Sequence, residues 1–238
     1  MIICIKILLK SIYDNQNRIN VTKDMPGIQQ LVFRAVDGLK TSKYLIDTAI
    51  KNIEGDISID EAQELLNSYY EENPKSGDDE RTEEADKVAV RIAKILSEKA
   101  FSFTPNEYIS IHKKLFTGIY GHAGKIRDYN ITKKEWVLDG ATVLYGSASE
   151  LRATLEYDFS EEKKFSYRNL TMDEIIHHLA IFVSRLWQIH IFGEGNTRTT
   201  AVSLLSICVH LVLMRRMIFL QKMPGILEMH LYELTITI

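Results

Sequence analysis

The chain has 238 residues, of which 45% are hydrophobic and 26% are charged, and its formal net charge is −3. This length suits one large domain, or one domain with a helical arm, and the composition is that of a globular protein. The charge gives no electrostatic reason to expect nucleic acid or an anionic membrane as a partner. Cys4 and Cys208 are too few for a disulfide framework, so we expect a protein of the reducing cytoplasm.

Neither of the two most apolar stretches is expected to target or cross a membrane. The first ten residues, MIICIKILLK, lack a basic leader before the apolar run and a small-residue cleavage site after it. The run at 203–214, SLLSICVHLVLM, is interrupted by His210 and is too short to span a bilayer comfortably.

Capping boxes mark the predicted helix starts. In such a box, Ser or Thr is followed three residues later by Glu, and the two side chains satisfy backbone N–H groups. Thr104 is the strongest start, because Pro105 takes the first helical position, where its missing N–H costs nothing. The four candidate pairs are Ser58/Glu61, Thr104/Glu107, Ser147/Glu150 and Thr171/Glu174.

Apolar residues recur at helical spacing after these starts, and we expect them to pack in a core. They are Leu65, Leu66 and Tyr69; Val88, Ile92, Ile95 and Leu96; Ile111, Leu115 and Ile119; and Ile175, Leu179, Phe182, Val183 and Leu186.

Two segments depart from this helical pattern. Residues 71–84, EENPKSGDDERTEE, are polar and are predicted to form a solvated loop between two helices. Residues 135–146, EWVLDGATVLYG, place Val, Leu, Trp and Tyr around Asp139-Gly140, which is a hairpin turn signal. We therefore predict an all-α fold, mainly a helical bundle, with one β-hairpin.

Residues 189–202, IHIFGEGNTRTTAV, contain the backbone features of an anion site. A predicted helix over 172–188 ends just before His190. Gly193 and Gly195 then let the chain turn before a second helix begins near Asn196. A glycine turn that leads into a helix N-terminus directs free N–H groups and the positive dipole end at one spot.

The side chains of this stretch add chemistry to the anion site. Arg198 can donate to phosphate oxygens. Glu194 would repel a phosphate unless a hard cation such as Mg²⁺ bridged the two. His190 has an intrinsic pKa near neutrality and could take a proton from a hydroxyl. Each residue alone is most simply structural, but together they predict phosphoryl or nucleotidyl transfer.

Other catalytic motifs are missing from the sequence. We find no G-x-x-x-x-G-K-[ST] loop, no H-E-x-x-H metal motif and no G-x-S-x-G nucleophile motif. His177 and His178 could be imagined as metal ligands together with His190. Being adjacent in a helix, however, they point to different faces, so we do not favour this reading.

The stretch HIFGEGNTR (190–198) resembles the signature of the Fic family, H-P-F-x-[DE]-G-N-x-R, whose members move AMP from ATP to a protein hydroxyl. LFTGIYGHAGKIRDYNI (115–131) resembles that family's approach to its β-hairpin flap, and the hairpin 135–146 stands where the flap is expected. NIEGDIS (52–58) resembles the inhibitory helix of some members. The resemblance covers about residues 35–202 and implies the Fic fold.

The resemblance also implies a domain organisation. An N-terminal helical region over 1–100, with an inhibitory-like helix at about 41–54, would precede a Fic core over 101–202. The substrates implied are Mg·ATP and a protein, which could be the chain itself, docked on the flap.

Residue roles follow from the same resemblance. His190 would be the general base toward a Tyr, Thr or Ser hydroxyl, Phe192 would anchor the loop, and Glu194 would hold Mg²⁺. Arg198 would pair with the β-phosphate, and Glu54 would be the inhibitory acid. The implied nucleotide-binding residues are Gly193, Glu194, Gly195, Asn196, Thr197 and Arg198.

Four positions depart from the family pattern. Ile191 replaces the usual Pro, and Thr197 replaces the commoner second Gly. Ala201 stands where many members carry a second arginine, and Ile50 stands where the inhibitory motif has Ser or Thr. An inhibitory Glu54 would therefore lack one of its usual partners.

The resemblance ends after Val202. Residues 203–238 hold four of the seven Met and no Asp or Asn. A back-translation read one base earlier gives a sequence that resembles the usual C-terminal segment of the family. We therefore hypothesise a one-base frameshift near codon 202, which resequencing that region of the gene would settle.

Two other function classes stay open. One is an inactive binding or regulatory module on the same fold. The other is a different transfer on the same scaffold, such as removal of AMP.

Overall fold

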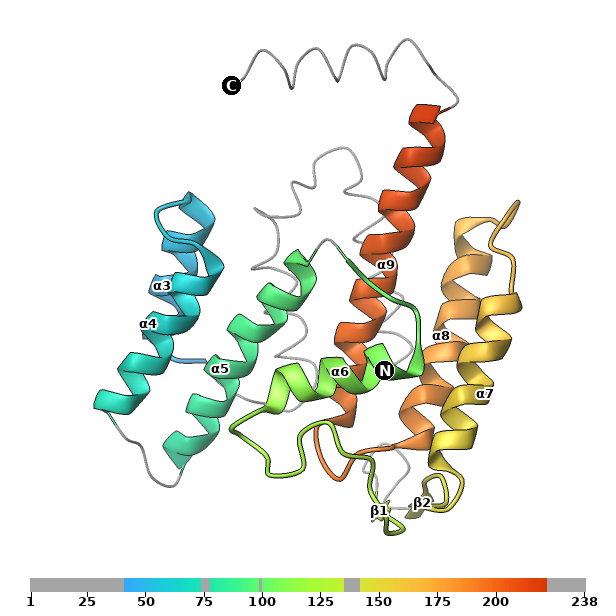
Figure 1. Ribbon diagram of the computed structural model, residues 1–238, viewed down its shortest axis with the longest axis horizontal. Helices are drawn as coiled ribbons and strands as arrows, with labels where there is room; N and C mark the ends of the chain where they lie inside the picture. Colours follow the sequence, from blue (N-terminus) through green and yellow to red (C-terminus); the bar gives the residue numbers. More distant parts are fainter. Residues whose placement is uncertain (1–40, 74–77, 99, 135–141, 222–238) are drawn as a thin grey trace.

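The computed structural model describes residues 41–73, 78–98, 100–134 and 142–221, which form seven helices and one two-stranded antiparallel sheet (Figure 1). This confirms the predicted all-α fold with one hairpin. The elements are α3 (Lys43–Glu54), α4 (Ile59–Glu72), α5 (Asp78–Ser97), α6 (Pro105–Phe116), β1 (Thr132–Lys134), β2 (Thr142–Leu144), α7 (Leu151–Lys164), α8 (Met172–Ile189) and α9 (Asn196–Gln221).

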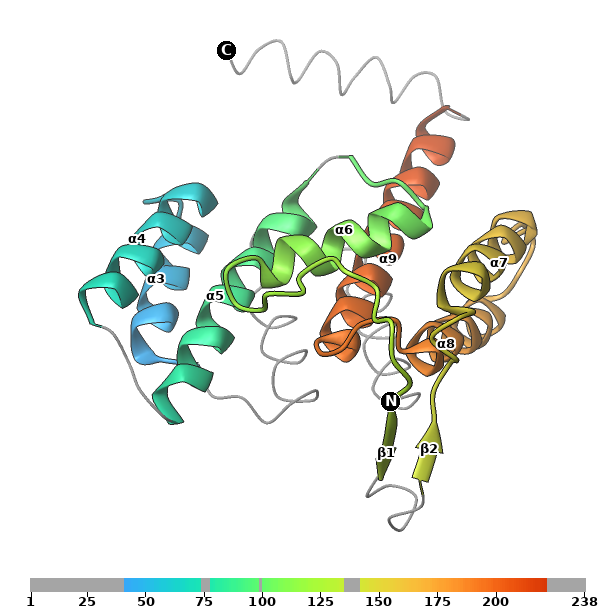
Figure 2. The same cartoon turned by 60° about the horizontal axis from the view of Figure 1, so that its bottom comes forward.

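Helix α9 runs through the middle of the bundle. It packs against α5 and α6 on one side and against α8 on the other, and α7 covers α8 (Figures 1 and 2). Helices α3 and α4 lie on the outer side of α5, away from α9 (Figure 1). In the described ranges, no helix is both long and apolar enough to cross a membrane.

Two clusters of buried side chains meet along α9. One lies toward α6, α7 and α8 and includes Leu204 and Ile207 of α9. The other lies toward α4, α5 and α6 and includes Val202 and Leu205. Most residues of the predicted apolar stripes lie in these clusters. Leu65, however, is 40% exposed, while its neighbour Leu66 is 1% exposed.

Three of the four predicted helix starts are confirmed. Ser58 and Thr171 form complete capping boxes at the starts of α4 and α8. Thr104 caps α6 by accepting the Glu107 N–H, and Pro105 opens that helix.

The fourth start, Ser147/Glu150, was wrong. The Ser147 carbonyl accepts the Glu150 N–H in a turn, and its hydroxyl lies 3.1 Å from the Ser149 hydroxyl. The helix begins later, at Leu151, without a side-chain cap. The sequence pattern matched a capping box, but the turn before the helix directs the Glu150 N–H to the Ser147 carbonyl instead of the Ser147 hydroxyl.

The predicted loop over 71–84 was also wrong in its second half. Helix α4 continues to Glu72, and α5 already begins at Asp78. Acidic residues near a helix N-terminus are favoured by the dipole, and Glu83 pairs with Lys87 one turn later, at 2.5 Å. The acidic run therefore starts a helix.

The hairpin pairs Thr132 with Leu144 and Lys134 with Thr142. The first strand therefore lies just before the predicted segment 135–146. The turn signal Asp139-Gly140 lies outside the described residues.

A buried carboxylate joins the three N-terminal helices. Asp86 of α5 is fully buried and accepts hydrogen bonds from the Ser42 amide and hydroxyl and from the Tyr70 hydroxyl. Ser42 caps α3, and Tyr70 lies on α4. Asp86 thus fixes α3 and α4 to α5.

We expect Asp86→Asn to lower the free energy of unfolding by about 1–3 kcal/mol, because one acceptor of these buried donors becomes a donor itself. Urea denaturation measures the change. Asp47→Asn, at an exposed position on α3, should stay within about 0.5 kcal/mol of the parent. Equal stability of the two variants would contradict the anchoring role.

Candidate active site

His190 ends α8 in a left-handed conformation, with φ 53° and ψ 58°. Its Nδ1 lies 3.2 Å from the Trp187 carbonyl oxygen. Because a carbonyl can only accept, this contact assigns the proton to Nδ1 and leaves Nε2 with a lone pair. The Tyr145 ring stacks on the imidazole, with centroids 4.0 Å apart. Burial is the main cause that lowers the pKa of His190 below 6.5, which favours the neutral base.

Arg127 holds this end of α8 in place. Its guanidinium, in a residue only 5% exposed, donates to the carbonyls of Ile189 and His190, with Nε 2.7 Å from the His190 oxygen. It also donates to the carbonyls of Tyr129 and Gly146, which flank the hairpin. One side chain therefore satisfies carbonyls at the helix end and at both ends of the hairpin.

Asn196 closes the loop that follows His190. Its side-chain amide accepts from the Phe192 N–H at 2.9 Å and donates to the Phe192 carbonyl at 2.8 Å. Asn196 is 2% exposed, and Phe192 is fully buried. Asn196, the first residue of α9, therefore holds the backbone of Phe192, the residue expected to anchor the loop.

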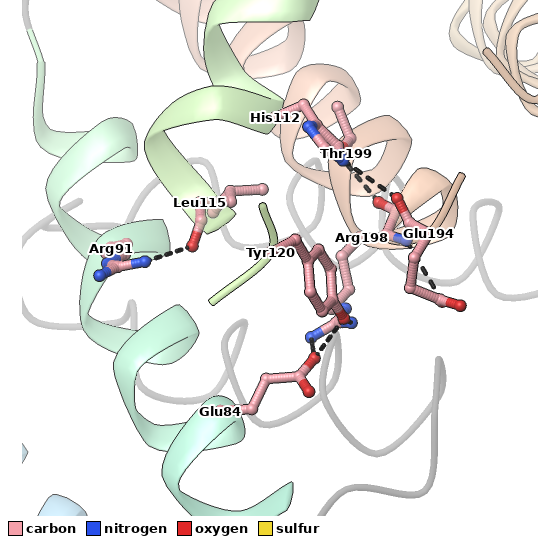
Figure 3. Close-up of polar contacts among 9 residues, drawn as sticks. Glu84, Arg91, His112, Leu115, Tyr120, Glu194, Arg198 and Thr199 are labelled. Atoms are coloured by element: carbon pink, nitrogen blue, oxygen red, sulfur yellow. Dashed lines mark hydrogen bonds and ion pairs between the residues drawn. The ribbon is translucent and has the colours of Figure 1, made fainter. Parts of the chain in front are cut away.

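His112 of α6 supports the same loop. Its ring stacks on Phe192, with centroids 3.7 Å apart. The Gly124 N–H donates to Nδ1, so Nε2 carries the proton that goes to the Glu194 carbonyl, at 3.0 Å (Figure 3). Burial lowers the pKa of His112 to about 4 and keeps this arrangement neutral.

The two loop glycines are needed for space. A Cβ at Gly195, where φ is +77°, would lie 2.5 Å from the Phe116 ring. A Cβ at Gly193 would lie 2.6 Å from the Tyr129 hydroxyl and 3.5 Å from His122 Nε2. That nitrogen is buried and has no hydrogen-bond partner among the described residues.

The start of α9 presents backbone donors beside a carboxylate. The N–H groups of Asn196, Thr197 and Arg198 belong to the first helical turn and have no acceptor within the helix. Glu194 is exposed, and its carboxylate accepts from the Gly195 N–H at 3.2 Å. This donor set suits a phosphate, and the carboxylate suits a hard cation beside it. Among the described residues, no group of three or more His, Cys, Asp or Glu side chains could hold a metal ion.

Arg198 faces α5. It is 3% exposed and forms an ion pair with Glu84 at 2.6 Å. Its Nη2 donates to the Tyr120 hydroxyl at 2.8 Å, and that hydroxyl donates to Glu84 at 2.6 Å (Figure 3). Its guanidinium also lies 4.7 Å from the centroid of the Phe116 ring. The predicted phosphate ligand is thus held by a carboxylate and a phenol in this structure.

Glu54 lies elsewhere. It is the last residue of α3, it is exposed, and Gly55 caps that helix in a left-handed conformation. In Figure 1 the turn from α3 to α4 lies at the end of the bundle opposite to the start of α9. The carboxylate that pairs with Arg198 is Glu84, and the inhibitory role of Glu54 stays a prediction.

The predicted residues 190–198 lie at the end of α8, in the loop that follows, and in the first turn of α9. Sequence reasoning did not find four residues that support this segment: Glu84, His112, Tyr120 and Arg127. Tyr120 and Arg127 lie in the stretch 115–131 that resembles the family, and His112 lies beside Ile111 of the predicted stripe, but no sequence pattern points to their contacts with the loop.

We expect Arg127→Lys to lower the free energy of unfolding by about 1–3 kcal/mol. The lysine ammonium keeps the charge, but it lacks the planar guanidinium that donates to the carbonyls at the helix end and at both hairpin ends. Urea denaturation is the measurement, and Arg152→Lys, at a 60% exposed side chain on α7, is the matched control. If both lysine variants unfold at the same urea concentration as the parent, Arg127 is not a structural clamp.

The comparison with known proteins identifies the region that contains this site. Residues 102–208 match the family model described as the Fic/DOC family. The match covers α6, the hairpin, the 190–198 loop and α9 as far as Cys208. The region therefore extends beyond Val202, and the hypothesis of a frameshift stays untested. No curated protein matches the chain significantly. Members of this family are generally transferases of phosphate-linked groups, and the chain contains a Fic domain over residues 102–208.

Proposed function

We propose that this protein transfers AMP from Mg·ATP to a Tyr, Thr or Ser hydroxyl of a protein. The observation that carries the proposal is His190, whose Nδ1 is held by the Trp187 carbonyl, one short loop away from the N-terminus of α9. A base and an anion site on one rigid loop are what transfer of a phosphate-linked group to a hydroxyl requires.

His190 acts as the base in this mechanism. The target hydroxyl oxygen attacks the α-phosphorus of ATP, the new O–P bond forms, and the bond to pyrophosphate breaks. Nε2 of His190 takes the hydroxyl proton. Its orientation is fixed by the Trp187 carbonyl on Nδ1 and by the Tyr145 ring on its face.

The phosphates would lie on the first turn of α9. The N–H groups of Asn196, Thr197 and Arg198 supply donors and the positive end of the helix dipole. Gly193 and Gly195 let the chain follow this turn, because a Cβ at either position would meet Tyr129 or Phe116. Glu194 would hold Mg²⁺, which neutralises phosphate charge when bound. We propose that the protein target docks on the hairpin, where Leu144 is 73% exposed.

An inactive binding module is the second candidate. The ion pair between Arg198 and Glu84 favours it, because the guanidinium that would serve a phosphate is already committed. Turnover separates the two proposals.

Labelled ATP tests the transfer directly. After incubation with Mg²⁺, protein should retain label from ATP marked on the α-phosphorus and none from ATP marked on the γ-phosphorus. We expect His190→Ala to lower the rate by about 10²–10⁴-fold, because the base is lost. His177→Ala, on the exposed side of α8, should label like the parent. Absence of label in the parent, or equal label in His190→Ala, would contradict the proposal.

The pH dependence of the rate follows from the burial of His190. The base works only when neutral, and its pKa in the folded protein is lowered from 6.5. Activity should therefore persist below pH 6.5 and be lost only as the pH falls through that lowered pKa. The acidic limb of kcat/KM against pH measures the pKa in the free enzyme. An acidic limb centred above 6.5 would show that burial does not control the base.

A further inference from the structure

A side-chain hydrogen bond joins the last turn of α8 to the first turn of α9. The indole Nε1–H of Trp187 donates to the hydroxyl of Thr197 at 3.1 Å. Both residues are partly buried. The chain between them contains the whole 190–195 loop, so this bond spans the loop that carries the base.

Trp187 contacts His190 in two ways. Its backbone carbonyl accepts the Nδ1–H of His190, and its ring meets the imidazole edge to face, with centroids 5.8 Å apart. Its ring makes a similar contact with Tyr145, which stacks on the His190 ring. The imidazole is therefore oriented by Trp187 and by Tyr145, a ring that packs against the indole.

We propose that Thr197 and Trp187 are positioning residues for His190. The hydroxyl fixes the indole, and the indole fixes the imidazole at a set distance from the first turn of α9. This inference rests on the proposed function, in which the target hydroxyl must lie between Nε2 and the phosphates. A small misplacement of a catalytic group can lower a rate by about 10²-fold.

The hydroxyl has a specific part in this arrangement. Thr197 also offers its backbone N–H to the anion site, but that N–H is present whatever the side chain. Replacing Thr by Val keeps the shape of the side chain and removes only the acceptor of the indole N–H. The two roles of residue 197 can therefore be separated.

Four variants test the inference: Thr197→Val, Trp187→Phe, Thr197→Ser, and Thr154→Val as the control on α7, where the exposed hydroxyl only donates to the Glu150 carbonyl. Labelling kinetics give kcat and KM for ATP. The ¹⁵N signals of the His190 ring, recorded without nucleotide, give its tautomer.

We expect Thr197→Val and Trp187→Phe each to lower kcat by about 5- to 50-fold, with KM for ATP changed by less than about 2-fold. Their His190 signals should move toward a mixture of tautomers. Thr197→Ser should restore most of the rate and the parent signals, and Thr154→Val should match the parent in both.

Two outcomes would overturn the inference. One is a Thr197→Val variant with parent kcat and parent His190 signals. The other is a rise in KM alone, which would make the hydroxyl a nucleotide contact. If the parent itself transfers nothing, the proposed function fails, and the His190 signals alone decide the inference. Unchanged signals in both Thr197→Val and Trp187→Phe would then refute it.

Discussion

The end of α8 depends on one buried guanidinium. A helix that stops inside a protein leaves carbonyls without partners, and leaving them unpaired would be costly. Arg127 donates to the carbonyls of Ile189 and His190 and, with the same fork, to those of Tyr129 and Gly146 beside the hairpin. Because His190 stands at this helix end, its side chain and the hairpin are held relative to each other.

The start of α9 is held from the other side of the loop. Asn196 binds both backbone polar groups of Phe192, and His112 packs on that ring while donating to the Glu194 carbonyl. Arg198 extends the support to α5 through Glu84. Since Asp86 of α5 also anchors α3 and α4, the N-terminal helices are connected to the loop through Glu84 and Asp86, which lie close together on one helix.

The parts that could be predicted from the sequence are local. Helix starts depend on residues three apart, and the motif residues lie in one short stretch, so Ser58, Thr104, Thr171 and the 190–198 loop were found. The residues that hold the loop from other elements could not be predicted in this way. Arg127 and His112 are far from the loop in the sequence. Only the packing of α6 and of the segment before the hairpin brings them into contact with it. The Ser147 start failed because the Glu150 N–H donates to the Ser147 carbonyl in a turn, which leaves no N–H for the Ser147 hydroxyl to cap.

In the proposed function, phosphates bind between Gly193 and Arg198, at the loop and the first turn of α9 beside His190. A titration with Mg·ATP, followed by the backbone ¹H–¹⁵N signals, tests the place of binding directly. We expect the largest changes at the amides of residues 193–198. The small pocket at the other end of α6 and along α9, lined by Glu98, Phe101 and His210, offers a clear contrast. Changes confined to that pocket, with the loop amides unmoved, would contradict the account.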